Sequence, residues 1–393
     1  MEGLSHDWGK IIQRSRSVAD KGAAGVEYLF RKNKIDFLKG EARLDKPGTV
    51  TVRGADGSES EHQAENILIA TGVVTRPFPG LPFNGTTVIG SKAALALPVQ
   101  PKSAIVIGAG AIGIEFASIW NDLGTRVTVV EMMPNILPVE DTEISQLLEK
   151  SLPKQGITIL ANHKTLKAEA EADDKGARIT VADASGAEKL LEADLVLVAI
   201  GVVPLLPGGT LAPELTDRGY LKTGERYETS VPGIYGAGDI IGPPWLAHVA
   251  SYEAIQAVSG MFVPDFEPRK VEIFPGCTYC HPQVASIGLT ERAAKEKGIP
   301  FKVGKFPYSA SGKARAINES EGLVKLVIGE PHGEILGAHL IGAEATEMLG
   351  ELSLGITLEA TIEELEETIH SHPTLSEMVK EAAEVAAGHP LHL

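Results

Sequence analysis

The sequence predicts an α/β protein of several domains that ends in an α+β unit. With 393 residues, the chain is longer than one hydrophobic core usually serves. From residue 103 onward a strand, a glycine turn, a helix and a second strand follow one another. After residue 270 the predicted strands gather together before the predicted helices do, which is typical of α+β units.

The composition excludes several classes of function. Apolar residues make up 43% and charged residues 22% of the chain, as in ordinary soluble proteins. The net charge of −16 disfavours nucleic acid and anionic membrane surfaces as partners. No apolar run approaches the roughly 20 residues of a spanning helix, and the first ten residues lack a signal pattern. We therefore expect a cytoplasmic protein.

The first hundred residues predict a helix followed by short strands. Residues 7–34 carry apolar side chains at helical spacing and basic residues at the end. Strand patterns then occur at 35–38, 49–53 and 67–70, with glycine-containing turns between them. A proline-rich connector at 76–82 and further prolines near residue 98 indicate a domain boundary there.

The rest of the chain alternates strands and helices before it changes character. Strands are predicted at 157–160, 177–181, 194–200 and 231–235, the last followed by a glycine turn and a helix at about 247–262. The carboxyl-terminal segment contains strand patterns and then three short helices. Its strands are expected at 284–289, 324–328 and 335–341.

A dinucleotide-binding motif follows the strand at 103–107. The sequence G-A-G-A-I-G places Gly108, Gly110 and Gly113 in the pattern G-x-G-x-x-G. The first glycine allows the tight turn, the second lets the backbone approach a pyrophosphate, and the third lets the helix pack on the strand. The helix N-terminus then presents N–H groups to the phosphates. A βαβ unit without a ligand is the alternative.

Two acidic residues belong to the same unit. Glu131 ends the next strand, 18 places after Gly113, where a carboxylate accepts hydrogen bonds from ribose hydroxyls and repels a 2′-phosphate. Met132 and Met133 offer no arginine for such a phosphate, so NAD is favoured over NADP. Glu115 is expected in the first turn of the helix, where complementing the helix dipole is its alternative role.

Five stretches, the glycine motif included, resemble a known family. G-A-G-A-I-G-I-E-F-A, T-S-V-P-G-I-Y-G-A-G-D, W-L-A-H-V-A-S-Y-E-A, Y-C-H-P-Q-V-A-S-I-G-L-T-E and H-S-H-P-T-L-S-E occur in this order. Together they resemble the dihydrolipoamide dehydrogenases, which belong to the flavin-dependent pyridine nucleotide-disulfide oxidoreductases. The resemblance extends from about residue 10 to 388, and its last motif is the most specific.

The resemblance implies a fold and its division into domains. It implies two Rossmann-like nucleotide-binding domains, one for FAD and one for NAD, plus an α+β dimerisation domain. The FAD-binding domain would be split between residues 1–97 and 214–270. The NAD-binding domain would occupy 98–213, and the dimerisation domain 271–393. A homodimer is implied, and the partner would be the lipoyl domain of a 2-oxo-acid dehydrogenase complex.

The resemblance also implies which residues meet the cofactors. Asp239 would bind the FAD ribityl chain, and Glu115 would border the nicotinamide. Without the resemblance, Asp239 reads as a turn-forming residue after Gly-Ala-Gly. The remaining FAD contacts or glycine-turn positions would be Ala42, Ala70, Thr71, Gly72, Gly201, Gly238, Trp245, Leu246, Ala247 and His248.

The sequence departs from the family pattern at three places. Val202 stands where the family usually has arginine, and Val73 stands where serine is usual. The larger departure concerns the first βαβ unit of the family, which carries its own G-x-G-x-x-G for FAD, and the helix with a C-x-x-x-x-C redox pair. Neither motif precedes residue 108. We therefore expect an FAD domain truncated at its N-terminal side, with weak FAD retention.

The only two cysteines form the motif C-T-Y-C at Cys277 and Cys280. In an extended segment, two residues three places apart point to opposite faces and lie about 10 Å from each other, too far for a disulfide. A zinc site needs two further ligands, and only His281 is close in sequence. We interpret both cysteines as structural, with a redox role in a tight turn and a metal site as the alternatives.

The motif H-S-H-P-T-L-S-E suggests a general base. Pro373 favours the first turn of a helix, which Gly388 would end, and Thr374 with Glu377 forms the capping-box pattern T-x-x-E. The resemblance instead implies that His372 is the acid/base, that Glu377 orients its imidazole, and that His370 is a packing or hydrogen-bonding neighbour. Such a base would take a thiol proton from dihydrolipoamide, acting across the dimer interface.

The resemblance implies an FAD- and NAD-dependent oxidoreductase with dihydrolipoyl dehydrogenase activity, acting in cell redox homeostasis. The alternative is a non-catalytic remnant that dimerises and binds NADH without lipoamide turnover, because the chain carries no matching redox cysteines.

Overall fold

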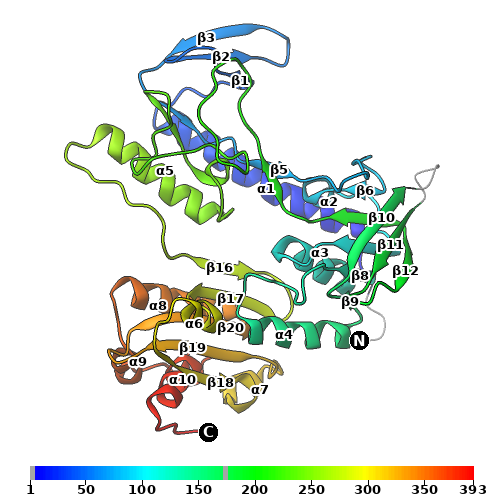
Figure 1. Cartoon of the computed structure of the whole chain (residues 1–393), viewed down its shortest axis with the longest axis vertical. Helices are drawn as coiled ribbons and strands as arrows, with labels where there is room; N and C mark the ends of the chain where they lie inside the picture. Colours follow the sequence, from blue (N-terminus) through cyan, green and yellow to red (C-terminus); the bar gives the residue numbers. More distant parts are fainter. Residues whose placement is uncertain (1–4, 171–175) are drawn as a thin grey trace. The chain divides into compact units, whose positions relative to one another are not determined.

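The computed structural model describes residues 5–170 and 176–393 and divides them into two compact units. The first unit contains Pro77–Ile200 and Ile273–Leu393, and the second contains Asp7–Arg76 and Gly201–Glu272. Figure 1 shows the elements of both units. Within the described ranges, no helix is long and apolar enough to cross a membrane.

The first unit contains a five-stranded parallel sheet in the order β6-β13-β7-β8-β9. Its central strands β7 and β13 read S-A-I-V-I and L-V-L-V and are buried along their whole length, as is usual for parallel strands covered on both faces. The predicted βαβ unit is confirmed. The strands are β6 (Val88–Ile89), β7 (Ser103–Ile107), β8 (Arg126–Val130), β9 (Thr158–Leu160) and β13 (Leu195–Val198).

Helices and a small antiparallel sheet accompany this parallel sheet. The helices are α2 (Ser91–Ala94), α3 (Ala111–Asp122) and α4 (Thr142–Ser151), and the 3₁₀ turn η1 (Leu152–Gln155) follows. The antiparallel sheet consists of β10 (Lys164–Ala170), β11 (Ala177–Ala182) and β12 (Glu188–Ala193). Of these three strands the sequence patterns predicted only β11, because β10 and β12 are mostly exposed and rich in charged residues.

The predicted α+β arrangement of the carboxyl-terminal part is confirmed. Its sheet is antiparallel in the order β16-β17-β20-β19-β18. The strands are β16 (Pro275–Thr278), β17 (Gln283–Gly288), β18 (Phe301–Pro307), β19 (Leu323–Gly329) and β20 (Ile335–Gly342). The helices are α6 (Glu291–Glu296), α7 (Gly312–Ala316), α8 (Ala345–Thr357), α9 (Ile362–Glu367) and α10 (Glu377–Ala387), with a 3₁₀ turn η3 (Tyr308–Ala310).

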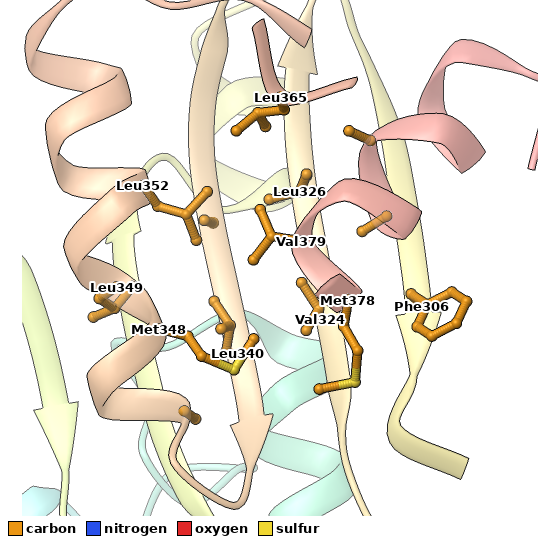
Figure 2. Close-up of a cluster of buried hydrophobic side chains, with 14 of the residues drawn as sticks. Phe306, Val324, Leu326, Leu340, Met348, Leu349, Leu352, Leu365, Met378 and Val379 are labelled. Atoms are coloured by element: carbon orange, nitrogen blue, oxygen red, sulfur yellow. The ribbon is translucent and has the colours of Figure 1, made fainter. Parts of the chain in front are cut away.

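A hydrophobic core joins α8 and α10 to this sheet. Figure 2 shows Leu349 and Leu352 of α8 and Val379 of α10 among side chains of β19 and β20. Leu326 and Leu340, at the centre of the cluster, are fully buried. Burying a leucine or valine side chain contributes about 1.5–3 kcal/mol, so this core holds the helices that flank the His-Ser-His-Pro motif.

The second unit is built from α1, α5 and three small sheets. Strands β1 (Glu41–Arg43), β2 (Thr49–Arg53) and β3 (Glu59–Gln63) form one sheet, β4 (Ile67–Ile69) pairs with β15 (Ile234–Gly236) in parallel, and β5 (Val73–Thr75) pairs with β14 (Val202–Pro204). The helices are α1 (Trp8–Lys32) and α5 (Ala247–Phe262), with a 3₁₀ turn η2 (Gly238–Ile241). Both helix predictions are confirmed.

One strand prediction in this unit is wrong. Residues 35–38, I-D-F-L, form no strand, and Ile35, Phe37 and Leu38 are about half exposed. Their apolar pattern reflects the end of α1: the Ile35 N–H bonds to the Phe30 carbonyl, and the rings of Phe30 and Phe37 lie 5.6 Å apart.

Candidate active site and nucleotide-binding sites

The glycine turn between β7 and α3 has the geometry that a pyrophosphate site needs. A Cβ atom on Gly108 would lie 2.4 Å from the Ala199 carbonyl oxygen, and one on Gly113 would lie 2.0 Å from the Gly108 oxygen. Gly108 also has φ +102°, in the left-handed region. At Gly110 a Cβ would meet nothing within 4 Å. The first and third glycines are therefore fixed by packing, while the second leaves open space at the N-terminus of α3.

Glu131 stabilises this turn directly. Its Oε2 accepts a hydrogen bond from the Ala109 N–H at 2.7 Å, and its Oε1 accepts one from the Met133 N–H at 2.8 Å. The residue is only 7% exposed. Each carboxylate oxygen can accept a second bond, so Glu131 can hold the turn and still receive ribose hydroxyls. No sequence pattern indicates this structural role of Glu131.

Glu115 lies in the second turn of α3, so its predicted position in the first turn is wrong. The helix begins at Ala111, one residue after the glycine that caps it. The Glu115 carboxylate accepts a hydrogen bond at 2.9 Å from the N–H of Tyr279, the residue that follows β16. Burial raises its pKa. Glu115 therefore connects α3 to the carboxyl-terminal segment and does not complement the dipole of α3 in its first turn.

Gly110→Ala and Gly113→Ala form a matched pair of variants. For Gly113→Ala we expect a loss of about 1–3 kcal/mol or more in the free energy of unfolding, because the new methyl group overlaps a backbone oxygen. For Gly110→Ala we expect about 1 kcal/mol or less, together with weaker NADH binding. Urea unfolding and NADH fluorescence titration measure the two effects. Unchanged NADH affinity in Gly110→Ala would contradict the prediction that the pyrophosphate binds at this turn.

The residues assigned to FAD by resemblance gather at the carboxyl ends of two parallel strands. β4 leads into Ala70, Thr71 and Gly72, and the adjacent β15 leads into Gly238 and Asp239. Ligands in α/β sheets bind at this edge. Thr71 and Gly72 both bond to the backbone of Leu205. The Thr71 hydroxyl donates to the Leu205 carbonyl at 2.5 Å, and the Leu205 N–H donates to the Gly72 carbonyl at 2.9 Å.

Asp239 is half-buried and follows a glycine in the left-handed region. Gly238 has φ +76°, and a Cβ there would lie 3.0 Å from the Ala250 side chain of α5. Burial raises the pKa of Asp239. Glu253 was not predicted from the sequence; it is a buried carboxylate on α5 that accepts a hydrogen bond from the Gly238 N–H at 2.8 Å. Its only signal was an acidic residue on a mostly apolar helix.

The other residues assigned to FAD have different surroundings. Trp245, Ala247 and His248 are exposed at the start of α5, and Leu246 is its half-buried N-cap. Ala42 lies on the exposed strand β1, where it pairs with Val52. These exposed positions and the residues at the carboxyl ends of β4 and β15 all belong to the second unit.

The two valine departures lie in one small two-stranded sheet, at opposite ends of its ladder. Val73 and Val202 begin β5 and β14, which pair antiparallel so that Val202 faces Thr75 and Val73 faces Pro204. Gly201 precedes β14 in the left-handed region, at φ +103°, and its oxygen accepts a hydrogen bond from the Arg76 N–H at 3.0 Å. Both valines suit a half-buried strand, which accounts for them structurally.

The structure brings His372 and Glu377 together. The imidazole Nδ1 lies 2.9 Å from Glu377 Oε1, and the other carboxylate oxygen, Oε2, accepts the Thr374 N–H at 2.8 Å. The two contacts expected of this motif, from Glu377 to His372 and from Glu377 to the Thr374 N–H, are thus made by different oxygens of one carboxylate. The His372 side chain is 80% exposed, so its Nε2 is accessible to a reactant.

The carboxylate of Glu377 is held in its charged form. Burial favours its protonation, but the Thr374 N–H, the hydrogen bond to His372 and the charges of His372 and His370 outweigh burial, and the pKa of Glu377 is lowered. The predicted helix start at Pro373 is wrong, because α10 begins at Glu377. The Thr374 hydroxyl bonds to the Ser371 carbonyl at 2.7 Å and folds these residues into a turn. The predicted end at Gly388 is confirmed.

The two cysteines are free thiols. Cys277 lies on β16 and packs against the carboxyl-terminal core, and Cys280 is buried in the turn beyond that strand. The Cys280 thiol faces two backbone carbonyls, of Thr278 and Pro282. Burial raises the pKa of Cys280 to about 12 and also raises the pKa of Cys277. The described residues contain no cluster of ligands that could hold a metal ion.

These thiols are expected to react slowly with alkylating or disulfide reagents, because the thiolate is the reactive species. Titration of the native protein with a chromogenic disulfide reagent near pH 8 should release little product at first. The same titration in denaturant should count both thiols quickly. A fast reaction of both cysteines in the folded protein would contradict the structural role.

Comparison with known proteins places the chain in a family. Residues 3–254 match the family described as "Pyridine nucleotide-disulphide oxidoreductase", and residues 274–383 match its dimerisation domain. The chain belongs to the pyridine nucleotide-disulphide oxidoreductases. This family uses FAD and NAD, which agrees with the open glycine turn after β7 and the polar edge after β4 and β15.

Three curated relatives of this oxidoreductase carry the same name, dihydrolipoyl dehydrogenase. It is 41% identical to the dihydrolipoyl dehydrogenase of Rhizobium etli, covering 100% of the chain and 85% of the relative. It is 42% identical to the enzyme of that name from Chlorobaculum tepidum, covering 97% of the chain and 81% of the relative. For the Bacillus subtilis dihydrolipoyl dehydrogenase the identity is 40%, with 99% and 84% covered.

Solved structures agree on the fold of this oxidoreductase. LpdA from Mycobacterium tuberculosis aligns with a TM-score of 0.87 and 24% identity, covering 97% of the chain and 84% of that structure. The HOCl-induced flavoprotein disulfide reductase RclA from Escherichia coli aligns with a TM-score of 0.83 and 24% identity, covering 97% and 86%. The predicted α/β fold with an α+β dimerisation domain is confirmed.

Proposed function

We propose that this chain acts as a dihydrolipoyl dehydrogenase, in which dihydrolipoamide loses two electrons and two protons to become lipoamide and NAD⁺ accepts a hydride to become NADH. One proton is released to solvent. The observation that carries the proposal is an exposed imidazole, His372, oriented by the carboxylate of Glu377. The identity to curated dihydrolipoyl dehydrogenases supports it.

In this reaction His372 is the proton acceptor. A charged carboxylate accepts hydrogen bonds and does not donate them, so Nδ1 of His372 carries the proton that faces Glu377. The Nε2 lone pair of the neutral ring is then free for a thiol proton of the substrate. Once Nε2 is protonated, the imidazolium lies 2.9 Å from the Glu377 carboxylate, which stabilises the charge.

The cofactor sites follow the same assignment. Gly108, Gly110 and Gly113 would receive the NAD⁺ pyrophosphate, Glu131 the ribose and Glu115 the nicotinamide edge. FAD, when bound, carries electrons between the thiol side and the nicotinamide. For FAD we propose Asp239 as the ribityl ligand, with further contacts at Ala42, Ala70, Thr71, Gly72, Gly238, Trp245, Leu246, Ala247 and His248. Gly201 is proposed as a further glycine turn at a bound nucleotide.

We also propose the organisation of the molecule. Residues 1–97 and 214–270 serve the FAD-binding domain, 98–213 the NAD-binding domain, and 271–393 the dimerisation domain. The dimerisation-domain match supports a homodimer. The lipoyl domain of a 2-oxo-acid dehydrogenase complex is the proposed partner, and the cytoplasm, with a role in cell redox homeostasis, is the proposed setting.

A second candidate function is a dimer that binds NADH without oxidising dihydrolipoamide. It is favoured by the state of Cys277 and Cys280, which are free, largely buried and of raised pKa. Dithiol oxidation in this family uses a C-x-x-x-x-C pair, and neither cysteine fits that pattern.

The two candidates separate in a single experiment. The purified protein is incubated with FAD, dihydrolipoamide and NAD⁺, and NADH is followed by its absorbance while NADH binding is followed by fluorescence. Turnover supports the dehydrogenase. Binding that weakens in Gly110→Ala, without turnover, supports the second candidate. A protein that neither turns over nor binds NADH contradicts both.

A further inference from the structure

The two helices α9 and α10 are joined by residues 368–376, which we call the histidine loop. Its two histidines lie in opposite environments: the His372 side chain is 80% exposed, whereas the His370 side chain is only 6% exposed. Ile369 between them and α9 is 94% exposed. The loop therefore turns most of its surface outward and is anchored by His370 and by Leu375, which is buried in the carboxyl-terminal hydrophobic core.

Both nitrogens of the His370 ring face hydrogen-bond acceptors. Nε2 lies 3.2 Å from Oε2 of Glu351 on α8, and Nδ1 lies 3.2 Å from the Thr368 carbonyl oxygen. A carbonyl only accepts, and a carboxylate only accepts. The ring therefore satisfies both contacts as an imidazolium, with one donor at each nitrogen.

Glu351 also needs this cation. Its second oxygen, Oε1, is buried and accepts no hydrogen bond from the part of the chain that the structure describes. The Glu351 side chain is 34% exposed, but a carboxylate oxygen shielded from water is costly unless a positive partner is close. His370 thus ties the loop to α8 through a charge that α8 itself requires.

We propose that Glu351 and His370 are positioning residues, which fix the histidine loop on α8 so that His372 keeps its Nδ1 on Glu377 and its Nε2 toward the reactant. The proposal rests on the function proposed above for His372. Neither positioning residue touches the reactant. They act through the two-residue connection from His370 to His372 and through the turn that Thr374 closes.

The charges around His370 give this pair a pH dependence. Glu351 faces it from α8, and Lys380 and Glu377 face it from α10. The hydrogen bond to Glu351 raises the pKa of His370 above its ordinary value of 6.5, against the opposing effects of burial and Lys380. The contribution of the His370–Glu351 pair to stability is therefore complete below about pH 6.5. It is lost as the pH rises through the raised pKa of His370.

The test measures the ring of His372 rather than turnover. The full-length protein is labelled with ¹⁵N-histidine, the His372 signals are assigned by their absence in His372→Gln, and the tautomer of the neutral ring is followed over a pH titration. In the wild type we expect the Nδ1–H tautomer. In His370→Phe, which keeps a buried ring, and in Glu351→Leu, we expect this preference to be lost, while His370→Gln retains part of it.

His389→Gln is the matched control, because His389 also pairs with a glutamate, Glu366, at 3.4 Å and is 67% exposed. It should leave the His372 signals unchanged. Thermal unfolding identifies any variant that fails to fold. If either His370→Phe or Glu351→Leu does not fold, the tautomer of His372 in the other one tests the proposal. Folded His370→Phe and Glu351→Leu proteins with the wild-type His372 tautomer would overturn the proposal. A lost preference in a protein without lipoamide turnover would uphold it and contradict only the proposed function.

Discussion

Replacing Lys325 by methionine is expected to lower the free energy of unfolding by about 3–5 kcal/mol. Lys325 lies in β19 and is 1% exposed. Its Nζ contacts Asp141 at 2.7 Å, Glu143 at 3.0 Å and Glu291 at 2.6 Å. Methionine fills much of the same space but leaves three carboxylates, one of them fully buried, without their common cation. Urea unfolding followed by circular dichroism measures the loss.

The matched control is Lys305→Met. Lys305 contacts the same Glu143 carboxylate at 2.6 Å, but its side chain is 41% exposed. Exposed pairs contribute about 1 kcal/mol or less. If the two variants lose equal stability, burial does not make the ion pairs of Lys325 more stabilising than the exposed pair of Lys305.

The effect of Lys325→Met should depend on pH. Burial raises the pKa of Asp141, but the hydrogen bond and charge of Lys325 outweigh it and the pKa is lowered; for Glu291 the hydrogen bond to Lys325 is the largest cause of a lowered pKa. Carboxylates with lowered pKa stabilise the fold above their ordinary values of 3.8 and 4.5 and lose this contribution as the pH falls. The difference between wild type and variant should therefore shrink in acid.

Replacing His372 by glutamine is expected to reduce dihydrolipoamide-dependent turnover by roughly 100- to 10,000-fold, the usual contribution of a positioned acid/base group. Glutamine keeps a polar side chain of similar reach but cannot accept a proton at neutral pH. NADH binding should be unchanged, because the glycine turn after β7 lies elsewhere in the unit. Initial rates and NADH fluorescence on the same preparation measure both.

His281→Gln is a suitable control for that variant. His281 is also exposed and lies 3.7 Å from a glutamate, Glu319, but it is outside the histidine loop. Its turnover should match the wild type. Near-normal turnover in His372→Gln would mean that another group takes the thiol proton.

Repeating patterns in the sequence were sufficient for much of the fold. Both long helices of the second unit, the βαβ unit and three strands of the antiparallel sheet follow from apolar periodicity and glycine turns. The exceptions have local causes. At residues 35–38 an apolar run packs back on the end of α1. At Pro373 a favourable helix-start residue is overruled by a side-chain turn between Thr374 and Ser371.

The candidate sites were predictable only where one motif contains all the participants. His372 and Glu377 are five residues apart, so their pairing follows from a single stretch of sequence. Glu351 is 19 residues from His370, and Lys325 is 184 residues from Asp141. Contacts of this kind arise from packing of separate elements, and no local pattern distinguishes a buried Lys325 from an exposed lysine in a strand.

The shared carboxylate of Glu377 couples chemistry to local unfolding. Its two oxygens hold the imidazole of His372, the proposed base, and the amide of Thr374 at once, so fraying of the first turn of α10 releases both together. The fraction of molecules with a competent base then equals the fraction in which this turn is closed. Hydrogen exchange at the Thr374 amide would consequently report, without any substrate, how often the enzyme is ready to react.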